Sequence, residues 1–448
     1  MSILRAAGWS ISGYVGVQFL RICSNLVLTR LLVPEMFGLM AVATTVHVAV
    51  AMFSDVGIRQ AAIQSQMGNR QEYLHTAWTL QFIHGISIWI ACLAISYGVA
   101  MADAFHLFPA GSVYAEPVLP AVIAVTCFSS VLAGLQSTKV ITAYRELSLG
   151  RLTAIELSVQ CVSLGVAVTL AWQTKSVWSF VIAALCSSAL TTILSFLWLP
   201  GRGNRFRLER FAARDLVRFG KWVLLSSAFT VLAASGDRIL LAGWISPAMF
   251  GLYILAFSLV SIFEGAGGRL FYSVAIPALS KVAREGPERL AAVFTRMRLP
   301  FDLVFIALAG VIYASGDVVV SILYDPRYEP AGEMLEILSF GLLFSRFGVL
   351  SNVYLAMGKP RILSLLNLVR GVAVFVLVPM SYLVFGMEGA MWAIAFHGLP
   401  SALLLIFVHM RHQLGNLKLE LLVFSAWPFG FAIGHLVDWI FIKVSLLV

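Results

Sequence analysis

Long apolar stretches recur along the whole chain, and they limit the possible folds more than any other feature of the sequence. Twelve of them are long enough to cross about 30 Å of hydrocarbon as α-helices. With 60% hydrophobic and only 12% charged residues, the chain has more apolar surface than a water-soluble core can hide. The alternating ten-residue segments of an outer-membrane barrel are absent. The sequence therefore predicts an all-α, polytopic membrane protein.

The apolar stretches fall into two groups of six. The first six are expected near residues 8–32, 36–56, 74–100, 117–137, 152–172 and 176–199, and the second six near 219–243, 247–271, 299–323, 333–357, 362–385 and 389–410. These groups predict an N-terminal six-helix lobe over residues 1–203 and a C-terminal six-helix lobe over 204–412. Residues 413–448 are expected to add one tilted span or two short ones, which makes thirteen or fourteen in total.

A repeated motif indicates that the two lobes are copies of one unit. Pro34-Glu-Met-Phe-Gly-Leu39 recurs as Pro247-Ala-Met-Phe-Gly-Leu252, and the same offset of 213 residues pairs Trp9 with Trp222. Because each lobe has an even number of crossings, the copies would share one orientation, related by a pseudo-two-fold axis along the membrane normal. A ligand path is then expected where the copies face each other. The motif itself is apolar and turn-forming, so we expect it to be scaffold.

The positive charges set the expected orientation, because cytoplasmic loops hold an excess of Lys and Arg. With the N-terminus in the cytoplasm, the inner loops hold 22 of the 31 Lys and Arg residues. Only Lys175, Arg327 and Lys443 fall in outer segments. The seven basic residues between Arg202 and Lys221 are expected to contact anionic membrane lipids as well as to set the topology. A specific partner site is the alternative.

The cysteines and the N-terminus give no sign of metal binding or export. All five cysteines lie in apolar stretches without CxxC spacing, so they are expected to be small buried side chains, and no metal or other cofactor is expected. The N-terminal stretch is interrupted by Arg21, Asn25 and Arg30, and no small-x-small cleavage site follows it. It is therefore expected to be a retained first span rather than a signal peptide.

Polar and charged residues inside the expected spans are the main functional signal. A charge at the bilayer centre costs roughly 2.5–3.5 kcal/mol even on the mildest scale, so each needs a partner or a watery cavity. In the first span, Tyr14, Gln18, Arg21 and Asn25 are spaced four, three and four residues apart, which places them on one helical face. This stripe would line either a substrate cavity or an interhelical hydrogen-bond seam.

The second copy keeps this polar position but changes its chemistry, since Asn25 corresponds to Arg238 and Ser24 to Asp237. Asp237 and Arg238 either neutralise one another or face different neighbours. Guanidinium groups hold phosphate oxygens in pairs and stay protonated, so a lining of arginines suits an anionic cargo. If these residues share one cavity, the predicted substrate-binding set is Arg21, Asn25, Arg238, Arg346 and Arg370.

A second set of residues is a candidate for gating or ion coupling. Glu264 and Arg269 enclose Gly-Ala-Gly-Gly, where the helix either breaks to free backbone groups or packs closely against a neighbour. Asp55 and Arg59 mark the end of the second span and form either an inner gate or only a boundary. His397 is either a proton-binding group or a packing residue. The full set is Asp55, Arg59, Asp237, Glu264, Arg269 and His397.

The order and spacing of several short motifs resemble the Wzx-type oligosaccharide flippases of the multidrug/oligosaccharidyl-lipid/polysaccharide (MOP) exporter superfamily. The motifs are Arg30-Leu-Leu-Val-Pro-Glu-Met-Phe-Gly-Leu39, Phe53-Ser-Asp-Val-Gly-Ile58, Tyr144-Arg-Glu-Leu147, Gly236-Asp-Arg238, residues 247–253 and Pro277-Ala-Leu279. The resemblance covers nearly the whole chain. It marks Arg30, Asp55, Arg145 and Arg238 as positions to test.

The resemblance also implies a function. Such a protein would move a polyprenyl-pyrophosphate-linked oligosaccharide from the cytoplasmic to the periplasmic leaflet of a bacterial inner membrane, by alternating access between its two lobes. Its cargo would be a repeat unit of exopolysaccharide, capsule or O-antigen. A polysaccharide polymerase or other assembly proteins would be its partners, and nucleic acid would not.

Two other functional classes are weighed against this one. A MATE-like drug/cation antiporter of the same fold would need an acidic residue deep in a lobe, for which Asp237 is the main candidate. A polymerase or glycosyltransferase would need acidic or histidine chemistry in large external loops. The outer loop over residues 101–117 carries only Asp103, His106 and Glu116, so we expect no enzyme.

Overall fold

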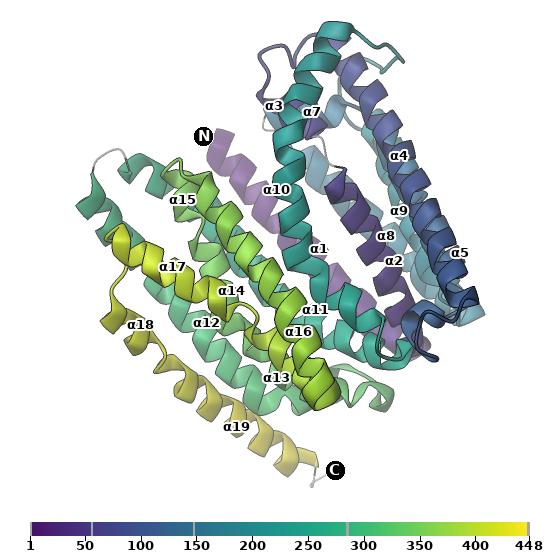
Figure 1. Ribbon diagram of the computed structural model, residues 1–448. Coiled ribbons are helices and arrows are strands. Elements are labelled where there is room, and N and C mark those ends of the chain that lie inside the picture. The colour runs from purple at the N-terminus through teal and green to yellow at the C-terminus, as the bar shows by residue number, and fades with distance from the viewer. Residues whose placement is uncertain (1, 55–56, 147, 284–285, 446–448) are drawn as a thin grey trace. The chain divides into compact units, whose positions relative to one another are not determined.

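The computed structural model describes residues 2–54, 57–146, 148–283 and 286–445, and every regular element in this part of the chain is a helix (Figure 1). Eight of these helices are long and apolar enough to cross a membrane, or ten if each of two bent helix pairs is one span. The all-α, polytopic prediction is confirmed. The chain forms two compact units.

The first unit comprises Met1–Val231 and Leu241–Gly251. Its longer helices are α1 (Ser2–Leu31), α2 (Pro34–Phe53), α4 (Gln71–Ala104), α8 (Leu149–Thr174), α9 (Trp178–Leu197) and the beginning of α10 (Arg210–Ala242). The shorter ones are α3 (Ile58–Gln64), η1 (Val113–Ala115), α5 (Leu119–Thr126), α6 (Ser129–Gly134) and α7 (Lys139–Arg145). Helix α8 packs between α1 and α9, whereas α4 packs on α5 and α6.

The expected fourth span is broken rather than continuous. It consists of α5 and α6, and the chain then bends by 66° into α7. The other five expected spans of the N-terminal lobe and the seventh span correspond to single helices whose bounds lie close to the expected ones. The lobes over residues 1–203 and 204–412 stay a prediction, because the two units divide the chain within α10 and α11 instead.

The two copies of the repeated motif lie against each other within the first unit. Pro34 is the first residue of α2, and Pro247 is the first residue of α11 (Pro247–Val282). A Cβ atom on Gly38 would collide with the carbonyl oxygen of Pro247, and one on Gly251 would collide with the carbonyl oxygen of Pro34. The contact is reciprocal, and each glycine allows the other helix to approach at backbone distance. The motif therefore has the packing role expected from its composition.

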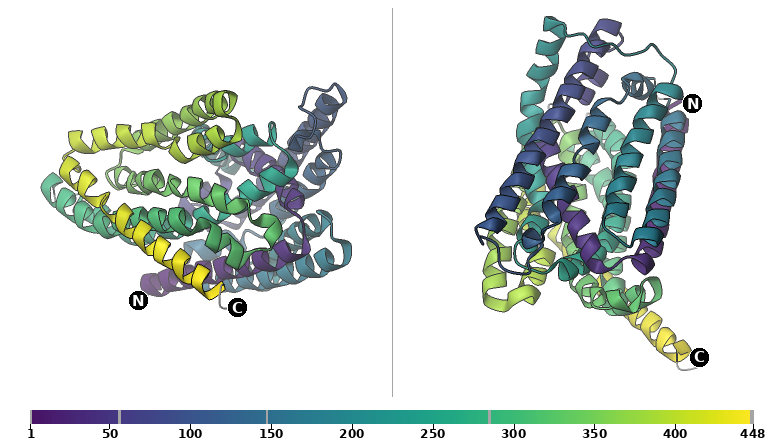
Figure 2. Two further views of the ribbon diagram at one scale, coloured as in Figure 1. Left: turned by 90° about the horizontal axis from the view of Figure 1, so that it is seen from below. Right: turned by 90° about the vertical axis from the view of Figure 1, so that its right-hand side faces the viewer.

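The second unit comprises Leu232–Leu240 of α10 and Leu252–Val448. After α11 it contains the long helices α12 (Pro287–Leu323), α16 (Pro360–Phe396), α17 (Leu399–Arg411) and α19 (Ala426–Ser445). The shorter elements are η2 (Pro326–Tyr328), α13 (Ala331–Ser339), α14 (Gly341–Leu350), α15 (Val353–Ala356) and α18 (Leu417–Val423). Helix α12 packs against α13 and α14, and α19 packs along α12 (Figure 2). Together α18 and α19 provide one candidate span, Lys418–Lys443.

Two interruptions shape the end of the second unit. Helix α16 bends at Gly386, whose φ of 64° and ψ of −146° are open essentially only to glycine. This bend falls between the expected spans 362–385 and 389–410. The second of these spans is interrupted again at His397 and Gly398, between α16 and α17. A break inside a span leaves backbone carbonyls without helical partners, so they must bond to side chains.

Candidate functional site

A group of five polar side chains, here called the polar cluster, lies in the second unit. Asp237 and Arg238 come from α10, Glu264 from α11, Arg370 from α16, and His397 from the break between α16 and α17. Glu264 interacts electrostatically with Arg370, Arg238 and Asp237, and His397 interacts with Arg370 and Asp237. The structure therefore brings together five residues that the sequence analysis proposed for two different roles.

The adjacent residues Asp237 and Arg238 face different neighbours. Asp237 is only 6% exposed and accepts a hydrogen bond from the hydroxyl of Tyr253, which is fully buried. The guanidinium carbon of Arg238 lies 4.4 Å from the ring centroid of Phe257, within the range of a cation–π interaction. Its Nε is buried without a hydrogen-bond partner among the described residues. Of the two interpretations left open by the sequence, the structure thus selects the second.

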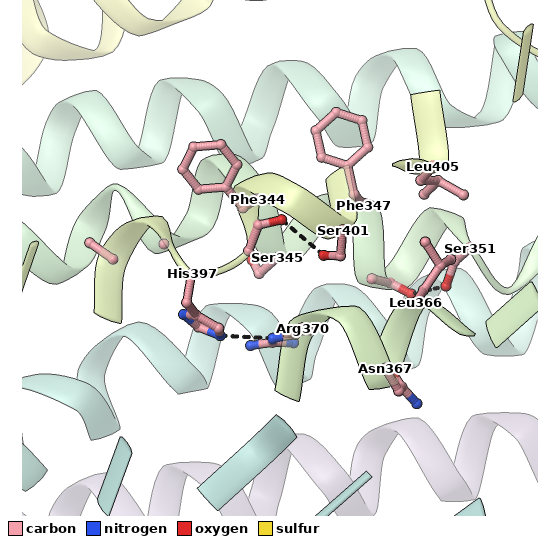
Figure 3. A pocket seen from close by; sticks show the side chains of 14 residues that line it. Phe344, Ser345, Phe347, Ser351, Leu366, Asn367, Arg370, His397, Ser401 and Leu405 are labelled. Atoms are coloured by element: carbon pink, nitrogen blue, oxygen red, sulfur yellow. Dashed lines mark hydrogen bonds between the residues drawn. The ribbon is translucent and has the colours of Figure 1, made fainter. Parts of the chain in front are cut away.

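The contact between Arg370 and His397 defines the protonation of the imidazole (Figure 3). The Nε of Arg370 donates to Nε2 of His397 over 2.8 Å, and Nδ1 of His397 lies 2.5 Å from the carbonyl oxygen of Ile394. Because a guanidinium can only donate, Nε2 must be the acceptor, and Nδ1 must carry the proton that it donates to Ile394. This geometry requires a neutral His397. A second proton, on Nε2, would remove the acceptor and place two cations in contact.

Two small cavities adjoin the polar cluster. The first has a volume of about 40 Å³ and is lined by Arg370, His397 and the hydroxyls of Ser345, Ser351 and Ser401, among others (Figure 3). The second, of about 50 Å³, is lined by Asp237, Glu264, Arg370 and His397, among others. A cavity needs a volume of at least roughly 10–15 Å³ to hold one water molecule. These cavities suit a few waters or a small ion, and they are too small for a sugar.

A second group of charges in the same unit is fully paired, and we call it the charge ring. Its members are Arg298 and Asp302 on α12, Arg346 on α14 and Glu420 on α18, and none is more than 6% exposed. Arg298 contacts Asp302 at 2.9 Å and Glu420 at 2.6 Å, while Arg346 contacts Asp302 at 2.8 Å and Glu420 at 3.3 Å. Each charge therefore touches two of opposite sign, and the group is neutral overall.

The contacts of the charge ring are partly ionic rather than aligned hydrogen bonds. Nη2 of Arg298, Nη1 of Arg346 and Oδ1 of Asp302 lie at ion-pair distance but lack hydrogen-bond alignment. Removing any one member would leave a buried charge without compensation. The charge ring joins three helices, and through Glu420 it fixes α18 and the start of the C-terminal segment to the rest of the unit.

Arg346, which the sequence analysis assigned to substrate binding, lies in the charge ring and does not line either polar cavity. Its substrate contact stays a prediction. The other three members, Arg298, Asp302 and Glu420, were not predicted from the sequence as site residues. The spacing of Arg298 and Asp302, four residues apart on one helix, was the only local signal for this pairing.

The remaining predicted site residues are distributed over both units. On α1, Arg21 is exposed and Asn25 is half-buried. Arg59 is exposed, and its guanidinium carbon lies 4.4 Å from the ring centroid of Tyr144. Arg269 is exposed on α11. Asp55 lies outside the described residues.

The glycine segment between Glu264 and Arg269 is helical, since α11 runs through it without a break. Gly267 is buried, and a Cβ atom there would meet the rings of Phe301 and Phe305 on α12. Close packing is therefore the role of this glycine, and no backbone groups are freed.

Arg145, one of the positions marked by the family resemblance, shapes the local backbone of the first unit. Its guanidinium donates to the carbonyl oxygens of Ala62, Ile63 and Ser65 at 3.1, 2.7 and 2.8 Å. Its Nε donates to the side chain of Asn69 at 3.0 Å. The first two carbonyls belong to the last turn of α3, where they lack helical partners. Arg145 therefore caps α3 and the turn that follows.

The long apolar helices and the buried, paired charges together define a multi-pass membrane protein. The chain belongs to a family of polysaccharide biosynthesis proteins, whose sequence profile matches residues 27–331. No curated protein matches the sequence.

Several solved structures share the fold. The lipid II flippase MurJ in an inward closed conformation has a TM-score of 0.70 at 15% identity, covering 96% of this chain and 92% of that chain. An inward-facing multidrug resistance MATE transporter of the MOP superfamily has a TM-score of 0.66 at 14% identity, covering 89% and 94%. A MOP superfamily transporter from Pyrococcus furiosus has a TM-score of 0.53 at 14% identity, covering 92% and 95%. The family and the fold confirm the resemblance to the MOP superfamily.

Proposed function

We propose that the protein is a flippase that moves polyprenyl-pyrophosphate-linked oligosaccharide units from the cytoplasmic to the periplasmic leaflet of a bacterial inner membrane. The observation that carries the proposal is the combination of a polysaccharide biosynthesis family with the fold of a lipid flippase. The family supports a role in polysaccharide biosynthesis, and the fold supports the movement of a cargo across a bilayer. Because one fold can serve several functions, the substrate must be argued from the site.

We assign substrate contact first to the polar stripe of α1. Arg21 is exposed on α1, which is expected from the sequence to be the first span, although a charge facing hydrocarbon is costly. A water-filled path removes that cost and leaves the guanidinium free to bind a pyrophosphate. Asn25, one turn further along, adds a hydrogen-bonding side chain to the same face. Within the second unit, Arg238 and Arg370 are the arginines that we assign to the cargo.

We assign ion coupling to the polar cluster. With both carboxylates ionised and His397 neutral, its two arginines balance its two acids, so its formal charge is zero. One added proton raises that charge to +1, and a proton on His397 also breaks its hydrogen bond from Arg370. Protonation can switch a protein between two conformations only if the proton binds more tightly in one conformation than in the other. Na⁺ or the membrane potential are the alternative energy sources.

The test of the cargo assignment is export in a strain that depends on this protein for its surface polysaccharide. Arg21→Ala is expected to abolish export while the amount of protein in the membrane stays unchanged, and Arg21→Lys to restore part of it. Arg327→Ala, at an exposed residue of η2, is the matched control and should export normally. Normal export by Arg21→Ala would contradict the proposed site.

A MATE-like drug/cation antiporter is the second candidate, and the buried carboxylate of Asp237 favours it. Such a protein would confer drug resistance on a sensitive host and lose it with Asp237→Asn. A flippase confers no drug resistance, and inactivating the flippase stops polysaccharide export. Measuring both outputs with the same Asp237→Asn variant separates the two functions.

A further inference from the structure

A cavity of about 470 Å³ lies between α11 and α12 in the second unit, apart from the polar cluster. Phe263, Gly267 and Phe271 of α11 and Phe301, Val304 and Phe305 of α12 are among its lining residues, and none of its lining side chains is charged or hydrogen-bonding. Its volume is about ten times that of either polar cavity and lies within the range of small-molecule sites. The cavity is suited to an apolar ligand.

The cavity runs along the two helices. Its lining extends from Phe263 to Ala275 on α11 and from Met297 to Leu308 on α12. A dozen helical residues span about 18 Å at 1.5 Å per residue. Val304 is 62% exposed and Phe263 is 38% exposed, so the cavity opens at the surface of the unit. An extended hydrocarbon chain matches the length and the apolar lining of this cavity.

Aromatic rings from both helices build the inner wall of the cavity. The rings of Phe301 and Phe305 lie 4.3 Å apart, and those of Phe271 and Phe301 lie 5.6 Å apart. Gly267 makes room for them, since any side chain at this position would displace Phe301 or Phe305. Pro300, inside α12, also lines the cavity and removes one backbone hydrogen bond from the helix there. These residues line the cavity where the two helices meet.

Positive charge lies at one end of the cavity. Arg296 is exposed on α12, and it shares a helical face with Pro300 and Val304 because the three are spaced four residues apart. Arg289 is exposed two turns earlier, and Lys281 is exposed in the last turn of α11. By the charge distribution of the loops, this is the cytoplasmic end. An apolar channel that ends at cations is complementary to a lipid with an anionic headgroup.

We propose that the cavity binds the polyprenyl chain of the lipid-linked substrate, with the phosphate next to Arg296. The identity of the chain rests on the proposed function, whereas the apolar cavity and its charged end do not. The cavity and the polar cluster share α11 as a wall, since Phe263 lines the former and Glu264 the latter cavity. The two faces of one helix would thus contact the lipid and the coupling site.

The test measures binding of undecaprenyl phosphate to the full-length protein in phosphatidylcholine nanodiscs. Val304→Trp fills the mouth of the cavity and is expected to weaken binding at least tenfold. Val384→Trp, at a similarly exposed valine of α16 outside the cavity, is the matched control and should bind normally. Arg296→Ala is expected to weaken binding about fivefold, the value of one basic residue near an anionic lipid headgroup. Ala266→Leu provides a second, milder block if Val304→Trp does not fold.

Two results would overturn the proposal. Unchanged binding in both Val304→Trp and Ala266→Leu would show that the chain lies elsewhere. Equal competition by phosphatidylglycerol would show a general lipid contact rather than a polyprenyl site. Failure of this proposal is distinguishable from failure of the proposed function. If the cavity does not bind the polyprenyl chain, Val304→Trp binds undecaprenyl phosphate normally while Arg21→Ala still abolishes export. If the proposed function is wrong, undecaprenyl phosphate binds but export does not depend on Arg21.

Discussion

The charge ring and the polar cluster use the same residue types in the same unit, but they differ in how their charges are paired. In the charge ring, each arginine contacts two carboxylates, and the exposed fraction of every member is 6% or less. In the polar cluster, Arg238 contacts a phenyl ring and Arg370 donates to a neutral imidazole, and two cavities adjoin them. A charge inside a span is thus no evidence of function by itself. Incomplete pairing beside a cavity is the stronger signal.

Opening the charge ring should have the largest effect. Arg346→Ala leaves two carboxylates facing only Arg298, and breaking a buried ion pair in this way typically costs 3–5 kcal/mol. We expect a large fall in the thermal stability of the purified protein and in its amount in the membrane. A variant with normal stability and lost export would instead place Arg346 among the substrate-binding residues, as the sequence analysis predicted.

Removing one positive and one negative charge together should restore much of the stability that Arg346→Ala loses. In the double variant Arg346→Met and Glu420→Gln, the remaining Arg298 and Asp302 still pair, so the buried charge is balanced. We expect the double variant to be more stable than the sum of the two single variants predicts, by 0.5–3 kcal/mol in a double-mutant cycle. Additive effects would show that the members act independently rather than as a ring.

The polar cluster should respond more weakly to a comparable change. Arg238→Ala removes a cation–π contact worth about 0.5–2 kcal/mol, so we expect a modest fall in melting temperature. Export should nevertheless be lost. Arg238→Lys retains the positive charge and tests whether the planar guanidinium is required. A stability loss as large as that of Arg346→Ala would remove the distinction between the two groups.

The smallest effect on stability is expected at His397. In His397→Gln the side-chain oxygen can still accept from Arg370 but cannot take up a proton. We expect near-normal stability, with flipping in vesicles that no longer responds to an imposed proton gradient. His435→Gln, at an exposed histidine of α19 outside the polar cluster, is the control and should keep the response. An unchanged response in His397→Gln would exclude proton coupling at this residue.

The sequence predicted the spans well, because an apolar stretch of about 20 residues must cross the bilayer wherever it packs. The division near Gly386 was predicted for this reason, and the structure places a glycine-only backbone conformation there. The breaks inside the fourth span, between α5, α6 and α7, were not predicted. They depend on side chains of other helices that satisfy the freed backbone groups, which a single sequence does not display.

The candidate site was predicted less completely, for a related reason. Polar and charged residues inside spans could be found by position, and five of them do meet in the polar cluster. The pairing of Arg346 could not be predicted, because one of its partners, Glu420, is 74 residues away in the sequence and the contact depends on tertiary packing. Glu420 is buried in the fold, but its sequence position does not show which charges it meets. The apolar cavity between α11 and α12 gave no sequence signal, because its lining has the composition of any span.

The reciprocal contact between the two repeated motifs also bears on how a chain of this kind can be assembled. Each copy offers a proline carbonyl to the other copy's glycine, so the contact is isologous. Two identical half-length chains would make the same pair of contacts and need no new surface to associate. The contact is therefore compatible with a homodimer of half-length chains as the ancestor of the duplicated sequence.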